Sequence, residues 1–359
     1  MNLTIVIGTR PNVIKVTQFK KMASLFENLR VEIVHTGQHY DRHMSGVFLE
    51  QFGMEVDRGY SLVGNSPAEQ FGNMVAKLGS DFADSRPDAI MVPGDVNSTL
   101  AAALAANKMD IPIHHLEAGL RSFDRTMPEE INRILVDQLS SQFYVTEESG
   151  IENLHSEGLT SNGQGVHLVG NTMIDTLVAF DQEIQGSKIC EKLGLGRGDF
   201  ILLTMHRPGN VDSHEGLSFI KDLISELNSV RKVVFPLHPR TKAKMEKHGI
   251  WQKLQSLDGL ILTEPLDYFS FQKLISFASV VVTDSGGIQE ETTYRQVQCV
   301  TIRPNTERPV TVEKGTNQLV GNSISEVLQA IQSPKKGEVP RFWDGQTTKR
   351  ILSRIMHDS

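Results

Sequence analysis

The 359-residue sequence contains only two cysteines, Cys190 and Cys299, and they do not form a CxxC pair. Two separate cysteines cannot form a zinc site by themselves, so we expect two free thiols and no metal site. No apolar run approaches the length of a bilayer span, and the first residues carry neither a basic flank nor a small-residue cleavage site. We therefore expect a cytoplasmic protein without a membrane partner.

The sequence also lacks a long run of either charge. Lys and Arg total 36 against 43 Asp and Glu, which gives a formal charge of −7. This balance disfavours nucleic acid as a partner, and any phosphate site must be built from local groups. There is no repeat at solenoid spacing and no low-complexity tract. With 39% hydrophobic residues, a chain of this length predicts a globular protein of about two domains.

Short apolar runs alternate with stretches of helical pattern through both halves of the chain. Continuous apolar runs are typical of strands buried on both faces, and intervening helices indicate parallel βαβ units. The predicted strands cover residues 3–7, 31–34, 89–92, 111–116, 142–145, 166–169, 200–204, 233–236, 260–262, 279–283 and 299–302. The predicted fold class is therefore α/β, with two Rossmann-like, doubly wound domains that face each other across a cleft.

Polar and charged residues follow most of these strands, where open α/β sheets place their ligands. Examples in the first half are Arg10, Asp95 and Glu117, and in the second half His206 and His238. Each residue also has a structural interpretation, since Asp95 could cap the helix that starts near residue 98. The recurrence of such residues at the same ends of both predicted sheets favours a functional cleft.

The segment that follows residues 280–282 predicts a phosphate site. Ser285, Gly286 and Gly287 come directly after the β-branched run and open a predicted helix. The glycines let backbone N–H groups at the helix N-terminus approach an anion, and Ser285 adds a hydroxyl donor. Glu290 and Glu291, one turn later, can accept hydrogen bonds from ribose hydroxyls. A nucleoside diphosphate fits this pattern, although a strand-to-helix turn with two glycines is an alternative interpretation.

Ten motifs occur in an order that resembles the non-hydrolysing UDP-N-acetylglucosamine 2-epimerase family: GTRP, HTGQH, GDVNST, LEAGLRSFD, PEEINR, GNT, HRPGN, DSGGIQEE, TERPV and WDG. The resemblance extends from Gly8 to about Arg350. It implies a fold of the GT-B type, with a first domain at residues 1–170, a second at residues 171–344, and a last helix at about 345–359 that packs back onto the first. It also implies a homodimer, a UDP-sugar substrate and no cofactor. The absence of a GxGxxG fingerprint and of a Walker A motif agrees with the last point.

The implied reaction interconverts UDP-GlcNAc and UDP-ManNAc. The hydrogen on C2 of a pyranose is not next to a carbonyl, so its direct removal would leave an unstabilised carbanion. Elimination of UDP solves this problem by giving a 2-acetamidoglucal, to which UDP then adds back. The reaction requires an acid and a base on opposite faces of C2 and a firmly held diphosphate.

The resemblance assigns residues to both requirements. It implies that the catalytic residues are Asp95, Glu117, Glu129 and His206. It does not show which carboxylate is the base. The substrate-binding residues that it implies are Arg10, Lys15, His238, Ser285, Gly286, Gly287, Glu291 and Arg308, with Arg207 and Asn171 lining or supporting the cleft. Glu129 and Glu130 could instead be acidic residues of a helix start behind Pro128, and Lys15 a solvated helix residue. His114 and His115 lie in an apolar run, and we expect them in the core or the cleft wall.

Several positions depart from the commonest pattern of the family. The chain has Asn12 after GTRP, Pro208 and Gly209 in HRPGN, and Val310 after TERP, and the stretch from Arg121 to Pro128 is short. These features, with residues 37–41, resemble relatives that act on other UDP-sugars, including UDP-2,3-diacetamido-2,3-dideoxyglucuronate. A 2-epimerase of such a sugar, or a hydrolysing relative that releases UDP and ManNAc, is therefore the alternative. The segment after His39 also diverges from members that bind UDP-GlcNAc as a regulator.

Overall fold

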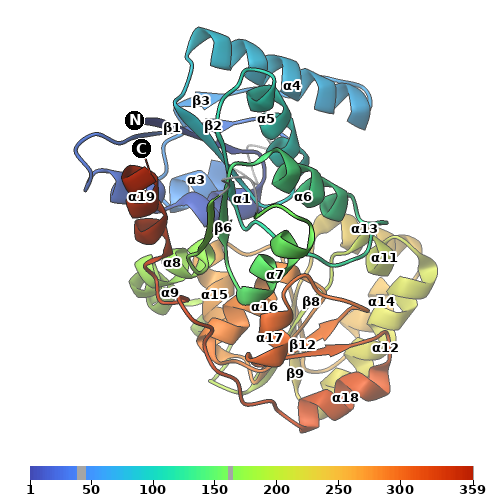
Figure 1. Ribbon diagram of the computed structural model, residues 1–359. Helices are drawn as coiled ribbons and strands as arrows, with labels where there is room; N and C mark the ends of the chain where they lie inside the picture. Colours follow the sequence, from blue (N-terminus) through green and yellow to red (C-terminus); the bar gives the residue numbers. More distant parts are fainter. Residues whose placement is uncertain (39–45, 161–164, 359) are drawn as a thin grey trace. The chain divides into compact units, whose positions relative to one another are not determined.

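The computed structural model describes residues 1–38, 46–160 and 165–358 and divides into two compact units. The first comprises Met1–Ala179 and Arg341–Ser359, and the second comprises Phe180–Pro340. Each unit contains one parallel sheet flanked by helices (Figure 1). This architecture confirms the predicted pair of doubly wound α/β domains.

The first unit is built on a seven-stranded sheet with the order β3-β2-β1-β4-β5-β6-β7 within the described residues. Its strands are β1 (Asn2–Ile7), β2 (Arg30–His35), β3 (Arg58–Gly59), β4 (Ala89–Pro93), β5 (Ile113–Leu116), β6 (Gln142–Val145) and β7 (Gly165–Leu168). Its helices are α1 (Arg10–Val16), α2 (Phe19–Ala23), α3 (Val47–Gln51), α4 (Pro67–Asp84), α5 (Asn97–Asn107), α6 (Pro128–Leu139), α7 (Glu148–Ser156), α8 (Thr172–Ala179) and α19 (Thr347–Asp358).

The second unit contains a six-stranded sheet with the order β10-β9-β8-β11-β12-β13 among the described residues. Its strands are β8 (Phe200–Thr204), β9 (Lys232–Pro236), β10 (Leu260–Thr263), β11 (Val280–Thr283), β12 (Cys299–Ile302) and β13 (Asn317–Val320). Its helices are α9 (Asp181–Gly186), α10 (Ile189–Lys192), α11 (Pro208–Val211), α12 (His214–Val230), α13 (Pro239–Lys247), α14 (Trp251–Gln255), α15 (Tyr268–Phe277), α16 (Gly286–Arg295), α17 (Pro309–Glu313) and α18 (Ile324–Gln332).

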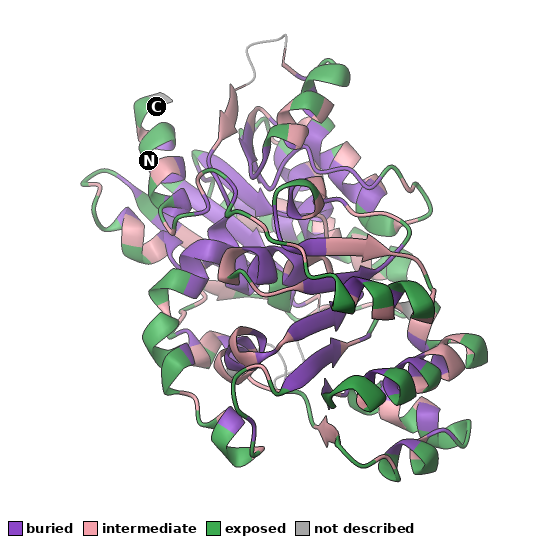
Figure 2. Cartoon of the chain, turned by 90° about the horizontal axis from the view of Figure 1, so that it is seen from below, coloured by how far each residue is buried: buried purple, intermediate pink, exposed green. Residues whose placement is uncertain are grey.

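Hydrophobic spacing explains why the helices cover the sheets. In α4 the buried residues Met74, Leu78 and Phe82 recur every four positions, and the Ser66 hydroxyl caps the first turn by accepting the Glu69 N–H at 3.2 Å. The apolar stripe of α12 packs in the same way on the second sheet. Figure 2 shows the result in each unit, with buried strands and helices that keep an exposed face. None of the described helices combines the length and the apolarity needed to cross a membrane.

All the predicted strands are confirmed, with ends that differ by two residues at most. Two edge strands were not predicted. β3 has only two residues, and β13 begins with Asn317 and Gln318, so neither contains the apolar run on which the prediction depended. Edge strands have one partner only, and they need less apolar sequence than central strands.

The division between the units falls after Ala179, whereas the sequence predicted a boundary at residue 170. The reason is that α8 packs on α1 of the first unit, where the Thr176 hydroxyl donates to the Ile14 carbonyl at 2.6 Å. The return to the first unit begins at Arg341, before the predicted residue 345. Trp343 is buried there, and its indole N–H donates to the Thr146 carbonyl at 3.1 Å.

The last helix, α19, is held at its first turn by a carboxylate from another helix. Asp175 in α8 accepts the backbone N–H groups of Thr347 at 3.0 Å and Thr348 at 2.5 Å. These N–H groups have no partner within their own helix. The positive end of the helix dipole also stabilises a carboxylate at this position. The contact ties the end of the chain to the first unit.

Candidate functional site

The carboxyl ends of β1, β4 and β5 lie side by side in the first sheet, because β1 pairs with β4 and β4 with β5. Asp95 and Glu117 lie in the loops after β4 and β5, and Arg10 is the first residue of α1, which follows β1. Parallel strands present all their carboxyl ends at one edge, so these residues share that edge of the sheet.

Glu117 forms a buried ion pair with Lys15 of α1. The distance from Lys15 Nζ to Glu117 Oε2 is 2.5 Å, and the two side chains are 7% and 3% exposed. The interpretation of Lys15 as a solvated helix residue is therefore wrong. Glu117 Oε1 is buried without a hydrogen-bond partner in the described part of the chain. This oxygen is thus available to a ligand.

The loops after β4 and β5 approach this ion pair closely, and their backbone geometry explains how. Gly94 has a φ of +67°, and a Cβ on it would lie 2.8 Å from Lys15 Nζ, so any larger residue would displace the lysine. Glu117 itself has a φ of +69°, which is unfavourable for a residue with a side chain. Strain of this kind costs about 1–3 kcal/mol and is found preferentially at functional sites.

Asp95 contacts Arg133 of α6, and the same guanidinium contacts Glu130. The interpretation of Asp95 as a helix cap is wrong, because α5 has Val96 at its N-cap and the Asp95 carboxylate binds Arg133. Glu130 is buried and accepts the backbone N–H groups of Ser122 and Phe123, each at 2.9 Å. It therefore orders the loop before α6, whereas the Asp95 side chain remains 26% exposed.

Glu129 lies on the exposed side of the first turn of α6, directly after Pro128 at the first helical position. An acidic residue here favours the helix N-terminus, as the structural interpretation of this motif predicted. The structure does not bring Glu129 into the buried contacts of Glu117 and Asp95. Its catalytic role stays a prediction.

His115 lies beneath this edge and links two of its loops. Its Nδ1 lies 2.6 Å from Asp137, and its Nε2 lies 2.9 Å from the Gly94 carbonyl. Burial alone would raise the pKa of Asp137, but the charges of His115 and Arg121 lower it. Both ring nitrogens of His115 thus lie within hydrogen-bond distance of an oxygen, and these contacts fix the ring in place. His115 is a core residue, and no described His, Cys, Asp and Glu side chains form a group of three suited to a metal ion.

The loop after β1 is fixed by Asn12, one of the departures from the common family pattern. Its Oδ1 accepts the Gly8 N–H at 3.2 Å and the Thr9 N–H at 3.3 Å, and its Nδ2 donates to the Pro93 carbonyl at 3.0 Å. An amide can both accept and donate in this way, whereas an ionised carboxylate can only accept. Arg10 is exposed, with its guanidinium 4.3 Å from the centre of the Phe48 ring. Of the divergent segment at residues 37–41, residues 39–41 lie outside the described part of the chain.

In the second unit, Ser285 is the N-cap of α16, directly after β11. Its side chain makes no capping hydrogen bond, and its own N–H donates to the Thr283 hydroxyl at 3.0 Å. The N–H groups of Gly286 and Gly287 lie in the first turn, where a helix offers no internal acceptor. A Cβ on Gly286 would lie 2.6 Å from Arg308 Nη1, so a glycine is needed for this guanidinium to approach. The predicted anion cradle therefore has a hydroxyl and helix N–H groups for a phosphate.

Arg308 is buried between two carboxylates. Its Nε lies 2.9 Å from Glu290 Oε2, and its Nη1 contacts Glu307. Arg303 adds a second cation, 2.9 Å from Glu307. Glu291, the predicted ribose ligand, is also buried. The charges beside the cradle are therefore largely balanced within the second unit.

The residue that sequence reasoning missed is Asp284, which precedes Ser285. It is fully buried and accepts the backbone N–H groups of His206 and Arg207, and its Oδ1 lies 2.9 Å from His206 Nδ1. Burial alone would raise the pKa of Asp284, but the hydrogen bonds from these groups and from Asn210 lower it. Its place directly after a predicted strand was the available signal, but the prediction treated it as part of the glycine motif.

The remaining predicted residues have clear local positions. His238 is exposed and caps α13, where its Nδ1 accepts the Arg240 N–H at 3.2 Å. Asn171 is buried in the first unit and accepts the Met173 N–H at 2.9 Å, which supports the start of α8. The Nε of Arg207 donates to the Asp284 carbonyl at 3.0 Å. Asn171 therefore supports the fold at the start of α8.

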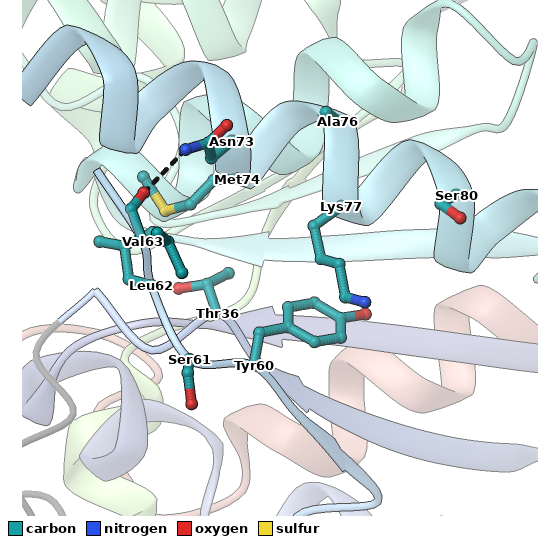
Figure 3. A pocket seen from close by; sticks show the side chains of 10 residues that line it. All are labelled: Thr36, Tyr60, Ser61, Leu62, Val63, Asn73, Met74, Ala76, Lys77 and Ser80. Atoms are coloured by element: carbon teal, nitrogen blue, oxygen red, sulfur yellow. Dashed lines mark hydrogen bonds between the residues drawn. The ribbon is translucent and has the colours of Figure 1, made fainter.

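A cavity of about 500 Å³ opens in the first unit between residues 60–63 and one face of α4 (Figure 3). Lys77 is the one charged residue among the described residues of its lining, and its Nζ lies 5.6 Å from the centre of the Tyr60 ring. The Asn73 amide donates to the Val63 carbonyl at 2.8 Å across its rim. None of the described lining residues carries a carboxylate, so they offer no pair of carboxylates for acid and base roles.

Comparison with known proteins gives one consistent result. The model of the family described as UDP-N-acetylglucosamine 2-epimerase matches residues 23–356. The chain is 37% identical over 367 residues to the UDP-N-acetylglucosamine 2-epimerase of Methanocaldococcus jannaschii, with 98% of each chain covered. It is also 37% identical, with 99% of each chain covered, to the UDP-2,3-diacetamido-2,3-dideoxy-D-glucuronate 2-epimerase of Pseudomonas aeruginosa. The crystal structure of the M. jannaschii enzyme in complex with UDP-GlcNAc and UDP superposes with a TM-score of 0.89 and 35% identity, covering 99% of this chain and all of the other.

The ion pair of Lys15 and Glu117 generates the first prediction. Lys15→Met leaves a buried carboxylate without its cation, and we expect it to lower the free energy of unfolding by about 3–5 kcal/mol in chemical denaturation. Adding Glu117→Gln should recover part of this loss, because the amide carries no charge. Lys108→Met, which changes an exposed lysine, is the matched control and should change the stability by less than about 0.5 kcal/mol. Equal stability of Lys15→Met and the control would contradict the prediction.

His35, at the end of β2, generates a pH-dependent prediction. Burial lowers the pKa of His35 from 6.5 to about 4, and its Nδ1 accepts the Gly37 N–H at 3.0 Å. The unfolded chain therefore binds more protons between pH 6.5 and 4, and stability falls as the pH drops through this window, by about 3 kcal/mol in total. Above pH 6.5 the His35 ring is neutral in both states, so it does not change the free energy of unfolding with pH. The His35 ring resonance should titrate near pH 4 in NMR spectra, and a midpoint above 6 would be inconsistent with this burial.

Proposed function

Because the chain belongs to the UDP-N-acetylglucosamine 2-epimerase family, we propose that this isomerase inverts C2 of UDP-GlcNAc to give UDP-ManNAc, and the reverse, without net hydrolysis. The observation that carries the proposal is the edge of the first sheet, where Asp95 and Glu117 follow adjacent strands and each contacts a cation. Two carboxylates held in this way suit proton transfer at one carbon.

The proposed reaction starts with the removal of the C2 proton by a carboxylate. The electron pair of the C2–H bond forms a C1–C2 double bond as the C1–O bond breaks, and the oxygen leaves with UDP. The resulting 2-acetamidoglucal and UDP stay bound. UDP then adds back to C1 while C2 takes a proton on the opposite face. Atoms and charges balance over the cycle, and no redox partner is needed.

We assign the acid and base roles to Asp95, Glu117 and Glu129. Glu117 is supported by its unpartnered Oε1 and its strained backbone, and Asp95 by its partly exposed carboxylate. Lys15 holds the Glu117 carboxylate in place, and Arg133 holds that of Asp95. Glu129 is supported by its exposure and by its motif.

We assign the diphosphate to the N-terminus of α16. Ser285, Gly286 and Gly287 supply a hydroxyl and backbone N–H groups, and the helix dipole favours the negative charge that develops as UDP departs. We assign to His206 the donation of a hydrogen bond or a proton to the departing phosphate. Arg10, Lys15, His238 and Arg308 add positive charge or donors, and Glu291 binds the ribose hydroxyls.

The substrate could instead be UDP-2,3-diacetamido-2,3-dideoxyglucuronate. The chain is equally similar to the relative named for this sugar and to the M. jannaschii relative. Both sugars carry an acetamido group on C2, so the same chemistry at C2 serves either one. We further propose that the enzyme acts as a homodimer and that its product supplies polysaccharide synthesis.

Incubation with UDP-GlcNAc in D₂O tests the reaction. We expect deuterium at C2 of UDP-ManNAc and of recovered UDP-GlcNAc, detected by NMR, because C2 must exchange its proton. Asp95→Asn should reduce this exchange by at least about 100-fold while UDP still binds. Asp84→Asn, at an exposed position of α4, is the matched control and should exchange at the normal rate.

The same experiment separates the alternatives. Exchange in the diacetamido uronate but not in UDP-GlcNAc would assign the second substrate. Release of UDP and free ManNAc in equal amounts would identify a hydrolysing enzyme. Absence of deuterium at C2 in both nucleotide sugars would contradict the proposed epimerisation.

A further inference from the structure

Asp284 uses its two carboxylate oxygens for different tasks. Oδ2 accepts three donors, the backbone N–H groups of His206 and Arg207 at 3.0 and 2.9 Å and the Asn210 side-chain amide at 2.9 Å. Oδ1 lies 2.9 Å from His206 Nδ1 and also accepts the His206 N–H at 3.2 Å. The carboxylate is fully buried, whereas the His206 side chain is 59% exposed. A buried anion thus holds one nitrogen of a ring whose other end is accessible.

We propose that Asp284 is a positioning residue that holds His206 with its proton on Nδ1 and its Nε2 available to the substrate. The inference rests on the proposed function for the role of His206, but the orientation follows from contacts within the second unit alone. A carboxylate accepts and cannot donate, so the ring nitrogen that faces Oδ1 must carry the proton. Nε2 is then the ring atom that takes up a proton, and the Asp284 carboxylate stabilises the protonated ring that donates this proton to the departing phosphate.

The two backbone hydrogen bonds strengthen this interpretation. They fix the main chain of His206 and Arg207 at the end of β8, so that the position of the ring depends on little more than its own two side-chain dihedrals. The bond between Nδ1 and Oδ1 then fixes the ring itself. Arg207 contributes a further bond from Nε to the Asp284 carbonyl at 3.0 Å.

The same geometry predicts what Asp284→Asn does. The amide oxygen must take the place of Oδ2, because three donors point at it and an NH₂ group there would repel them. The NH₂ group therefore takes the place of Oδ1 and donates to His206 Nδ1. The ring proton moves to Nε2, so the substitution inverts the tautomer without removing a side chain.

The test combines spectroscopy with kinetics on the full chain. In ¹⁵N spectra of the unliganded protein at pH 8, we expect His206 to be protonated on Nδ1 in the wild type and on Nε2 in Asp284→Asn. The turnover number for C2 inversion should fall by about 100-fold or more in the variant. The affinity for UDP, measured by calorimetry, should stay close to the wild-type value. An unchanged tautomer in the variant would overturn the proposal.

A double-substitution cycle separates positioning from general damage to the fold. In a His206→Gln background, Asp284→Asn should cost little further activity, because its effect passes through the missing ring. Two independent, multiplying losses would overturn the proposal. Asn210→Ala is the matched control, since it also removes one hydrogen bond to Asp284 but should keep the proton on Nδ1.

Failure of the proposed function and failure of the positioning role of Asp284 give different results. A wild-type protein that inverts no sugar would defeat the proposed function, while the ¹⁵N spectra would still show whether Asp284 sets the tautomer. A wild-type protein that inverts its substrate, but carries the His206 proton on Nε2, would defeat the positioning role alone.

Discussion

Ionised side chains that leave water at the carboxyl ends of parallel strands must be neutralised by the protein, and both units are organised around this constraint. In the first, Lys15 neutralises Glu117, and Arg133 joins Asp95 to Glu130. In the second, hydrogen bonds satisfy the carboxylate of Asp284. A buried charge without such partners costs several kcal/mol, so these pairs restrict where the loops can lie. The site and the stability of the loops therefore depend on the same contacts.

The constraint also explains the strained backbone. Glu117 adopts a left-handed conformation while its N–H donates to the Tyr144 carbonyl at 3.0 Å. Phe123 adopts a similar conformation, and Glu130 holds its N–H. Such conformations persist when the surrounding bonds determine them. In both loops a carboxylate takes part, either as the strained residue or as its anchor.

Much of this organisation could be predicted from sequence. Runs such as Val280–Val282 show a buried strand directly, and the position of Ser285 after it is enough to predict the helix N-terminus. The family resemblance is confirmed across nearly the whole chain. The role of Asp284 could not be predicted, because its partner His206 lies 78 positions earlier and only the pairing of β8 with β11 brings them together. The boundary at Ala179 depends in the same way on packing of α8 against α1, which leaves no local signal.

The central claim is that the bond from C1 to the UDP oxygen breaks and reforms on the enzyme. It is tested most directly with UDP-GlcNAc that carries ¹⁸O in the atom bridging C1 and the β-phosphorus. The account predicts that ¹⁸O moves into non-bridging positions of the β-phosphate in both recovered substrate and epimer, which ³¹P NMR detects as an isotope shift. Epimerisation at C2 with all ¹⁸O retained in the bridge would contradict it.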